Sequence, residues 1–320
     1  MVEISCAFAT SLDTPDHVAI AEELGYRRAW LYDSPALYPD VWMMLGECAR
    51  RTSIIEIGPG VAIPSLRHPM VTASAIVTLA ALAPGRVNMA IGSGFTGRLT
   101  LGQKPLPWRF VREYVIAVQG LLAGETVEWE GAPIRMMHPA GFGAERPLRV
   151  PFILGTGGPK GNAAAHELAD GVFVTTPTAE FERCAVLTFG TVLDDGEDQG
   201  STRSMAAAGH AGALAYHAVH LRGDVTTLPG GDRWLAALEE FPAREQHLAL
   251  HEGHLIEANE RDRLVVTGET LAMFGYARSA AAWRAHVDTQ VAAGATEIAY
   301  QPAGPDVAGE LRRFIDAVSS

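Results

Sequence analysis

Short apolar runs alternate with helical patterns along almost the whole chain, and this alternation constrains the fold more than any other feature of the sequence. Strands that alternate with helices pair in parallel, because each helix returns the chain to the same end of the sheet. Eight apolar runs are expected to be strands. They occupy residues 4–9, 29–32, 54–61, 86–92, 151–158, 170–175, 183–194 and 296–302.

Eight parallel strands predict a (β/α)8 barrel of the α/β class, the TIM barrel. A doubly wound sheet is the rival architecture, but it normally has fewer strands and an early nucleotide-binding loop. Helices are expected at residues 14–25, 40–51, 68–85, 107–124, 159–169 and 306–318.

Two insertions are expected in this barrel. Two alternating runs around Gly131, residues 125–136, predict a hairpin after the fourth helix. Residues 201–293 are mostly helical with long loops, which predicts a helical excursion before the eighth strand. Because no Gly/Ser-rich or Pro-rich linker, repeat or charge block interrupts the chain, we expect a single domain over residues 1–320.

Composition narrows the classes of partner. The 25 basic and 37 acidic residues give a net charge of −12, which disfavours nucleic acid and anionic membranes as partners. No apolar run reaches about 18 residues, the length of a membrane span, and the first residues do not have the pattern of a secretory signal. We therefore expect a cytoplasmic protein whose partners are neither nucleic acid nor membrane. The pattern leaves open whether it forms a homodimer.

Cysteine spacing gives no sign of a metal or disulfide framework. Cys6, Cys48 and Cys184 lie far apart, and no CxxC pair is present. Reduced thiols are the simplest interpretation.

The glycine-rich stretch "GTGGPKG", residues 155–161, follows the fifth strand. Its exposed main-chain amides, a helix N-terminus opened by Pro159, and the charge of Lys160 together predict a phosphate site. An ordinary strand-to-helix turn would also suit Gly-Gly-Pro.

A second stretch, "GSGFTG" at residues 92–97, matches the G-x-G-x-x-G dinucleotide fingerprint. The residues that follow are not a clean helix start, and the acid near the expected spacing, Glu113, lies inside a helical pattern. We therefore interpret this stretch as a glycine-rich loop at the end of the fourth barrel strand.

Four polar residues are candidates for catalysis. Asp33 and Ser34 lie just past the second strand, on the face where barrel active sites lie. Asp-Ser-Pro also suits a turn, so a capping role stays open for Asp33. His251 and His254 belong to "HLALHEGH", which lacks the HExxH spacing and a carboxylate cluster. No metal site is predicted; these histidines are expected to line a pocket or to make structural hydrogen bonds.

The third strand is broken at its carboxyl end by Gly58, Pro59 and Gly60, in "IEIGPGVAIPSLRHP". Glycine inside a strand often marks a bulge or a close backbone approach, and proline donates no ladder hydrogen bond. A bulge with ordinary trans bonds would explain the pattern, but a resemblance to a family offers a second explanation.

Several blocks of the sequence resemble the luciferase-like TIM-barrel oxidoreductases. The branch that uses the deazaflavin coenzyme F420, such as methylene-tetrahydromethanopterin reductase, is the most similar. The blocks are "LGYRRAWLYDS", "GPGVAIPSLRHPMVTASAIVTLAALAPGRVNMAIGSG", "LGQKPLP", "EYVIAVQGLLAGETVEWEG" and "GTGGPKGNAAAHELADGV", within residues 24–174. "AGATEIAYQPAG" resembles the last strand of that family.

The resemblance implies a site for the cofactor at the strand ends. Asp33 matches an acid that approaches the deazaflavin ring. The bond between Gly60 and Val61 matches a non-prolyl cis peptide that backs the ring, and Ala62 would offer only its backbone. The remaining positions match the ring-and-ribityl loop, at Ser93 and Gly94, and the phosphate loop, at Gly157, Gly158, Lys160 and Gly161.

Two departures from related enzymes bear on the substrate. Ser34 stands where the sugar-phosphate dehydrogenase relatives have a catalytic His, and Phe95 stands where they have a Glu. Without that acid and base, the resemblance argues against glucose 6-phosphate as the substrate.

The resemblance thus implies hydride transfer between coenzyme F420 and a small organic substrate, with residues 201–293 covering the barrel mouth. An FMN-dependent monooxygenase and a non-catalytic flavin-binding protein are the alternatives. The loops do not separate F420 from FMN, because both carry the same phosphate-terminated ribityl arm. F420 also carries an oligoglutamate tail, which needs positive charges nearby. Four cations near the strand ends therefore favour F420, namely Arg67, Arg98, Lys104 and Lys160.

Overall fold

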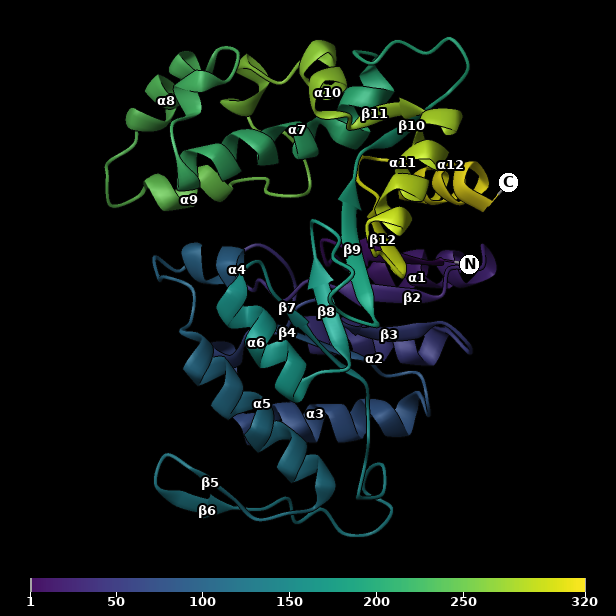
Figure 1. Cartoon of the computed structure of the whole chain (residues 1–320), viewed down its shortest axis with the longest axis vertical. Helices are drawn as coiled ribbons and strands as arrows, with labels where there is room; N and C mark the ends of the chain where they lie inside the picture. The colour runs from purple at the N-terminus through teal and green to yellow at the C-terminus, as the bar shows by residue number, and fades with distance from the viewer. Residues whose placement is uncertain (1, 320) are drawn as a thin grey trace. The chain divides into compact units, whose positions relative to one another are not determined.

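Eight strands form the main sheet of the computed structural model, which describes residues 2–319 (Figure 1). Their order is β3-β2-β1-β12-β9-β8-β7-β4. Parallel register is present in the pairs β1–β2, β2–β3, β4–β7, β7–β8 and β8–β9. The strands are β1 (Glu3–Phe8), β2 (Arg28–Leu31), β3 (Glu56–Pro59), β4 (Met89–Gly92), β7 (Phe152–Gly155), β8 (Gly171–Val174), β9 (Cys184–Phe189) and β12 (Glu297–Gln301).

Main-chain contacts join the two ends of this sheet, β3 and β4. Ile57 and Val87 form one parallel bridge, and Ala62 and Ile91 form another. The Ala62 amide donates to the Ala90 carbonyl oxygen at 2.7 Å. The predicted (β/α)8 barrel is therefore confirmed.

Helices follow the strands as the sequence predicts. They are α1 (Thr14–Glu23), α2 (Val41–Arg51), α3 (Pro69–Leu82), α5 (Trp108–Ala123) and α6 (Pro159–Leu168). Asp40 caps α2 by accepting from the amides of Trp42 and Met43, and Gly124 ends α5 in the left-handed conformation. Strands β2, β4 and β8 are buried along their whole length, as expected for barrel strands covered by helices.

The expected hairpin is also present. Strands β5 (Val127–Trp129) and β6 (Ala132–Ile134) pair in antiparallel register after α5. Glu130 and Gly131 form the turn, and both have a positive φ.

Two local predictions were wrong. The stretch "GSGFTG" does open a helix, the short α4 (Phe95–Leu99), which follows Gly94 at φ 78°. The predicted strand at 183–194 is divided at Gly190, whose φ is 126°. The chain bends there because it passes the Tyr276 carbonyl, and a Cβ on Gly190 would lie 2.2 Å from that oxygen. The second piece, β10 (Thr191–Leu193), pairs with β11 (Ala277–Ser279) instead of joining the barrel.

Contacts within the chain divide it into two units, each described by itself below. The first comprises the chain through Leu187 together with Val291–Ala299, and the second comprises Thr188–Gln290 and the chain from Tyr300 onward. The single domain expected from the sequence stays a prediction. In residues 2–319, none of the helices combines the length and apolar character that a membrane span requires.

The excursion before β12 is mostly helical, as predicted. Its core is aromatic and aliphatic, with Tyr216, Trp234 and Leu271 fully buried. Its elements are α7 (Thr202–Arg222), η2 (Val225–Thr227), α8 (Gly231–Glu239), α9 (Gln246–His251), η3 (Asp262–Leu264), α10 (Gly268–Phe274) and α11 (Ala280–Ala292), and α12 (Val307–Ser319) follows β12.

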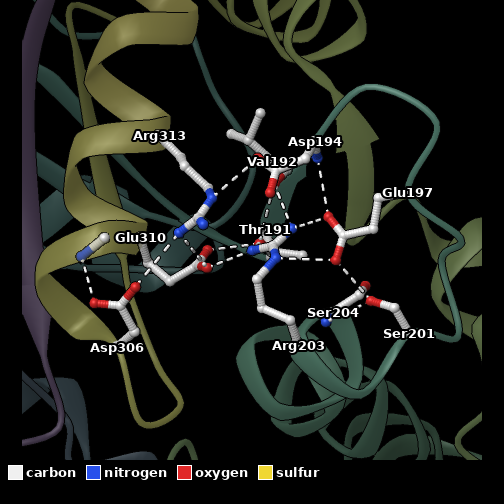
Figure 2. A network of polar contacts seen from close by, with 12 residues as sticks. Thr191, Val192, Asp194, Glu197, Ser201, Arg203, Ser204, Asp306, Glu310 and Arg313 are labelled. Atoms are coloured by element: carbon white, nitrogen blue, oxygen red, sulfur yellow. Dashed lines mark hydrogen bonds and ion pairs between the residues drawn. The ribbon is translucent and has the colours of Figure 1, made fainter.

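A polar network holds β10, α7 and α12 of the second unit together (Figure 2). Arg203 donates to Glu310 at 2.5 Å, to the Thr191 hydroxyl at 3.0 Å and to the Val192 carbonyl at 2.9 Å. It also pairs with Glu197, and this contact holds the pKa of Glu197 down at about 2. The network satisfies the buried Glu310 carboxylate, so we interpret it as structural.

Candidate functional site

Asp33 connects the ends of β2 and β3. It follows β2, its exposed fraction is 8%, and its Oδ2 accepts a hydrogen bond from the Ile63 amide at 3.2 Å. The turn that follows is closed by the Ser34 carbonyl, which accepts from the amides of Leu37 and Tyr38. The Asp33 side chain thus accepts from the segment that follows β3. This hydrogen bond is not a cap of the turn after β2, which is the alternative role that the sequence left open for Asp33.

The environment of Asp33 makes its carboxyl a weak acid. Burial raises its pKa to about 6, although the Ile63 amide and the charge of Arg67 act in the opposite direction. Asp40 adds a smaller upward effect. A carboxyl with this pKa can hold or release a proton near neutral pH, which is what general acid–base chemistry requires.

The broken end of β3 lies against two other strand ends. The bond between Gly60 and Val61 is cis, as the resemblance implies. A Cβ built on Gly92 or on Gly155 would lie 2.9 Å from a methyl group of Val61. Gly60 itself packs on Trp30, where a Cβ would lie 2.8 Å from the Trp30 Cβ. The glycines at the ends of β4 and β7 therefore make room for Val61 between them.

The loop after β4 is fixed by main-chain and arginine contacts. The Ser93 carbonyl accepts from the Leu106 amide at 2.8 Å. Arg98 donates to the Lys104 carbonyl at 2.6 Å and to the Ser65 hydroxyl at 2.5 Å. The two predicted cations therefore belong to neighbouring segments, Arg98 to α4 and Lys104 to the loop that follows it. Arg67, by contrast, is paired with Asp40.

The predicted phosphate loop contains glycines of two kinds. A Cβ on Gly157 or Gly158 would meet no atom within 4 Å, whereas a Cβ on Gly161 would lie 2.6 Å from the Trp108 ring. Gly161 is thus required for packing between α6 and Trp108. Gly158 is the N-cap of α6, and Lys160 is exposed in its first turn.

The amides of this loop are available to a ligand. Within residues 2–319, the main-chain amides of Gly157 and Gly158 donate no hydrogen bond to the protein. Open space, free amides and a helix N-terminus are the features that a phosphate group needs.

His251 and His254 lie in the second unit, inside a buried aromatic cluster. The His254 ring stacks on His217 with centroids 5.7 Å apart, and the His251 ring lies 5.3 Å away. His217 and the Trp234 indole both contact the same oxygen of Asp262, at 3.1 and 2.8 Å. Burial lowers the pKa of both His251 and His254, which favours their neutral forms. Their catalytic role stays a prediction.

The His251 ring nitrogen Nδ1 lies 2.7 Å from the His247 carbonyl, which fits the structural alternative. Among the described residues 2–319, no three or more His, Cys, Asp or Glu side chains are arranged to hold a metal ion.

Ile63 and Gly97 are residues of this site to which the sequence assigned no role of their own. Ile63 contributes a main-chain donor, for which the sequence carries no side-chain signal. Gly97 ends the "GSGFTG" motif, and a Cβ there would lie 2.4 Å from the Ile63 Cδ1 atom and 3.0 Å from the Asp33 carbonyl oxygen. The glycine spacing of the motif drew attention to Gly97, but it did not predict the contact of Gly97 with Ile63.

A parallel eight-stranded barrel with glycine-rich loops and a buried carboxyl at the carboxyl ends of its strands has the architecture of the (β/α)8 barrels that bind ligands on this face. The chain belongs to the luciferase-like monooxygenase family, whose pattern matches residues 11–187.

Curated proteins with similar sequences have names that refer to reductases and dehydrogenases. The chain is 33% identical over 162 residues to 5,10-methylenetetrahydromethanopterin reductase of Archaeoglobus fulgidus, covering 49% of this chain and 47% of the relative. It is 30% identical over 175 residues to F420-dependent glucose-6-phosphate dehydrogenase of Microbacterium testaceum, covering 50% and 52%. The chain thus spans about half the length of the curated relatives it matches.

A solved structure matches the chain along its whole length. Coenzyme F420-dependent tetrahydromethanopterin reductase from Methanopyrus kandleri aligns over 99% of both chains with a TM-score of 0.65 and 20% identity. At this identity the likeness shows the shared fold.

Proposed function

We propose that this chain is an oxidoreductase that transfers a hydride between coenzyme F420 and a small organic substrate. The observation that carries the proposal is Asp33, a buried carboxyl with a pKa of about 6 at the mouth of the barrel strands. The names of the relatives with 33% and 30% identity support the choice of cofactor.

The residues of the strand ends fit such a cofactor. Gly157, Gly158 and Lys160 would bind the phosphate of its arm, because they offer open space, free amides and a positive charge. Ser93 and Gly94 would adjoin the ribityl chain, and Gly60, Val61 and Ala62 would back the ring. When bound, F420 supplies a ring that accepts or gives a hydride.

Asp33 would hold a proton at its carboxyl while hydride moves, or accept one in the reverse direction. Ser34, beside it, is 8% exposed and is not an acid in this pH range, so it would serve only as a hydrogen-bonding group. Since Ser34 replaces the histidine implied for the sugar-phosphate dehydrogenases, we propose a substrate other than glucose 6-phosphate.

An FMN-dependent monooxygenase is the second candidate, and the name of the family itself favours it. The phosphate loop would serve either cofactor. A non-catalytic flavin-binding protein is the third, and it would bind cofactor without turnover.

Cofactor titration tests the proposal. We expect F420 fluorescence to be quenched on binding, with an affinity well above that for FMN in a parallel titration. Tighter binding of FMN would contradict the proposal and favour the monooxygenase. Binding of F420 without any F420-linked turnover in a substrate screen would favour the non-catalytic protein.

Gly158→Asp sharpens this titration. The substitution adds bulk and negative charge beside the phosphate, so the Kd for F420 should rise at least tenfold, which is about 1.4 kcal/mol. Aspartate is a favourable N-cap, and no atom lies within 4 Å of a Cβ at this position, so α6 should keep its stability. Gly158→Ala, which adds bulk alone, is the matched control and should have a smaller effect. An unchanged Kd in Gly158→Asp would overturn the phosphate assignment.

We also propose that the protein pairs with a second copy through the groove between α2 and α3. The groove carries Met43 and Val71, which are 70% and 47% exposed, beside small residues such as Gly46 and Ser74. Light scattering should give the mass of a dimer, and Met43→Glu should shift it towards the monomer. A monomer in the wild type would contradict the proposal.

We place the protein in the cytoplasm. Its three cysteines are buried free thiols, which fits a reducing compartment. The net charge of −12 supports a small-molecule ligand over nucleic acid.

A further inference from the structure

Ile63 contacts two loops of the strand-end site through different parts of the residue. Its main-chain N–H donates to Asp33 Oδ2 at 3.2 Å. Its side chain lies against two glycines: a Cβ on Gly94 would be 2.6 Å from Ile63 Cγ2, and a Cβ on Gly97 would be 2.4 Å from Ile63 Cδ1. With an exposed fraction of 4%, this one residue joins the loop after β2 to the loop after β4.

The backbone of Ile63 is held on both sides. Pro64 follows it and favours the extended conformation observed, with φ −109° and ψ 115°. The Ile63 carbonyl accepts from the Leu66 amide at 3.0 Å. On the other side, the Ala62 amide and carbonyl bond to Ala90 and Gly92. The direction of the Ile63 N–H is therefore fixed before any ligand binds.

The Ile63 N–H is the main donor to consider at the Asp33 carboxyl. Within residues 2–319 it is the one group that donates a hydrogen bond to that carboxyl. The charged or titratable groups around Asp33 are Arg67, Asp40 and Tyr114. Arg67 and Asp40 pair with each other, so their charges largely compensate.

We propose that Ile63 is the positioning residue of this site. Its N–H fixes the Asp33 carboxyl, and its side chain, seated against Gly94 and Gly97, ties that carboxyl to the loop after β4. The consequence for turnover rests on the proposed function, in which Asp33 exchanges a proton. The contacts themselves do not depend on it.

A pair of substitutions separates this role from simple packing. Gly97→Ala places a methyl group 2.4 Å from the Ile63 Cδ1 atom, so the Ile63 side chain must turn or shift, and we expect this shift to weaken the hydrogen bond from the Ile63 N–H to Asp33. Ile63→Val lacks that Cδ1 atom, so the double variant Gly97→Ala/Ile63→Val removes the clash with Ile63 and keeps the 3.0 Å approach of the new methyl group to the Asp33 carbonyl oxygen. Ile57→Val is the matched control, because it deletes the same methylene from a buried residue of β3 away from Asp33.

The measurement is the pKa of Asp33 in the cofactor-free protein, from a carbon-13 carboxyl titration assigned with Asp33→Asn. Because the N–H favours the charged form, we expect Gly97→Ala to raise this pKa by about 0.5 or more. The double variant should return it more than halfway to the wild-type value, and Ile57→Val should leave it unchanged. In the holoenzyme, the pH profile of turnover should shift in the same direction.

Ile63→Ala keeps the test decisive if Gly97→Ala does not fold. It leaves the two glycines without their neighbour, and the same upward shift is expected. An Asp33 pKa that does not move in either variant, or one that moves as far in Ile57→Val, would overturn the proposal. Because the titration uses no cofactor, a shifted pKa in a protein that does not bind F420 would support the positioning role and reject the proposed function alone.

Discussion

The two ends of the barrel strands bury carboxyl groups in opposite ways. At the amino ends, Glu297 is 1% exposed and accepts from Arg28 at 2.5 Å and from the Trp30 indole at 2.8 Å. At the carboxyl ends, Asp33 is 8% exposed and accepts one hydrogen bond from a main-chain amide. Burial alone would raise both pKa values. Arg28 and Arg183 hold the pKa of Glu297 below its usual value, whereas the pKa of Asp33 rises to about 6.

The opposite pKa shifts distinguish a carboxylate with a structural role, Glu297, from a carboxyl that can exchange a proton, Asp33. Glu297 stays ionised because its neighbours are charged donors, so it has no proton to exchange near neutral pH, and its loss would leave buried positive charge poorly compensated. Asp33 lacks such partners, so its ionised form is disfavoured in the fold and its proton is available. A buried carboxyl with too few donors is therefore the better candidate for chemistry.

The largest effect is expected at the amino ends. Glu297→Gln removes the most buried of the three carboxylates that pair with Arg28, whose side chain is 5% exposed, while Glu56 and Glu3 remain as partners. Because Glu56 and Glu3 still compensate part of the charge, the free energy of unfolding should fall by about 3 kcal/mol, the lower end of the range for a broken buried pair. Urea unfolding measures this change.

Glu3→Gln is the matched control for Glu297→Gln. Glu3 also pairs with Arg28, but its side chain is 44% exposed, so its loss should cost about 1 kcal/mol or less. Equal losses in the two variants would break the proposed distinction between buried and exposed partners.

The second effect is on turnover. Asp33→Asn keeps the shape and can still accept from the Ile63 amide, but it removes proton exchange. We expect turnover to fall about 10²-fold or more, equivalent to about 2.7 kcal/mol, with F420 affinity barely changed. The assay is F420 absorbance with a substrate found by screening. Full activity in this variant would refute the catalytic role.

How much of this comparison the sequence predicts depends on the range of each contact. The barrel followed from the alternation of strands and helices, and Asp33 followed from its place after β2. The Ile63 donor could not be predicted, because a main-chain N–H carries no residue signal and its acceptor lies in another loop. The pairing of Arg28 with Glu297 joins residues at the two ends of the chain, so it depends on strand register that the sequence does not reveal.

Second-unit details were harder to predict for similar reasons. The division of the strand at 183–194 depends on Gly190 meeting Tyr276, which is distant in sequence. The histidine motif was visible, but the stacking of His254 on His217, which in turn contacts Asp262, depends on tertiary packing.

The last effect is a pH-dependent gain in stability. The folded pKa of Asp33, about 6, lies above its usual value of 3.8, so the folded state binds more protons between these pH values. Linkage then requires the wild type to lose stability as the pH rises from about 4 to 6. Asp33→Asn should therefore be more stable than the wild type by about 3 kcal/mol at pH 7.5, since each pKa unit corresponds to about 1.4 kcal/mol, and the difference should vanish near pH 4. Urea unfolding across this range measures it, and a less stable variant at pH 7.5 would contradict the assignment.

A carbon-13 titration of the side-chain carboxyls in the wild-type protein tests the central claim most directly, because both carboxyls are followed in one sample. The Asp33 signal is assigned from its absence in Asp33→Asn, and the Glu297 signal from its absence in Glu297→Gln. We predict an Asp33 pKa near 6 and a Glu297 pKa below the usual 4.5. An Asp33 pKa at or below its usual 3.8 would contradict the account, because the carboxyl at the strand mouth would then have no proton to exchange near neutral pH.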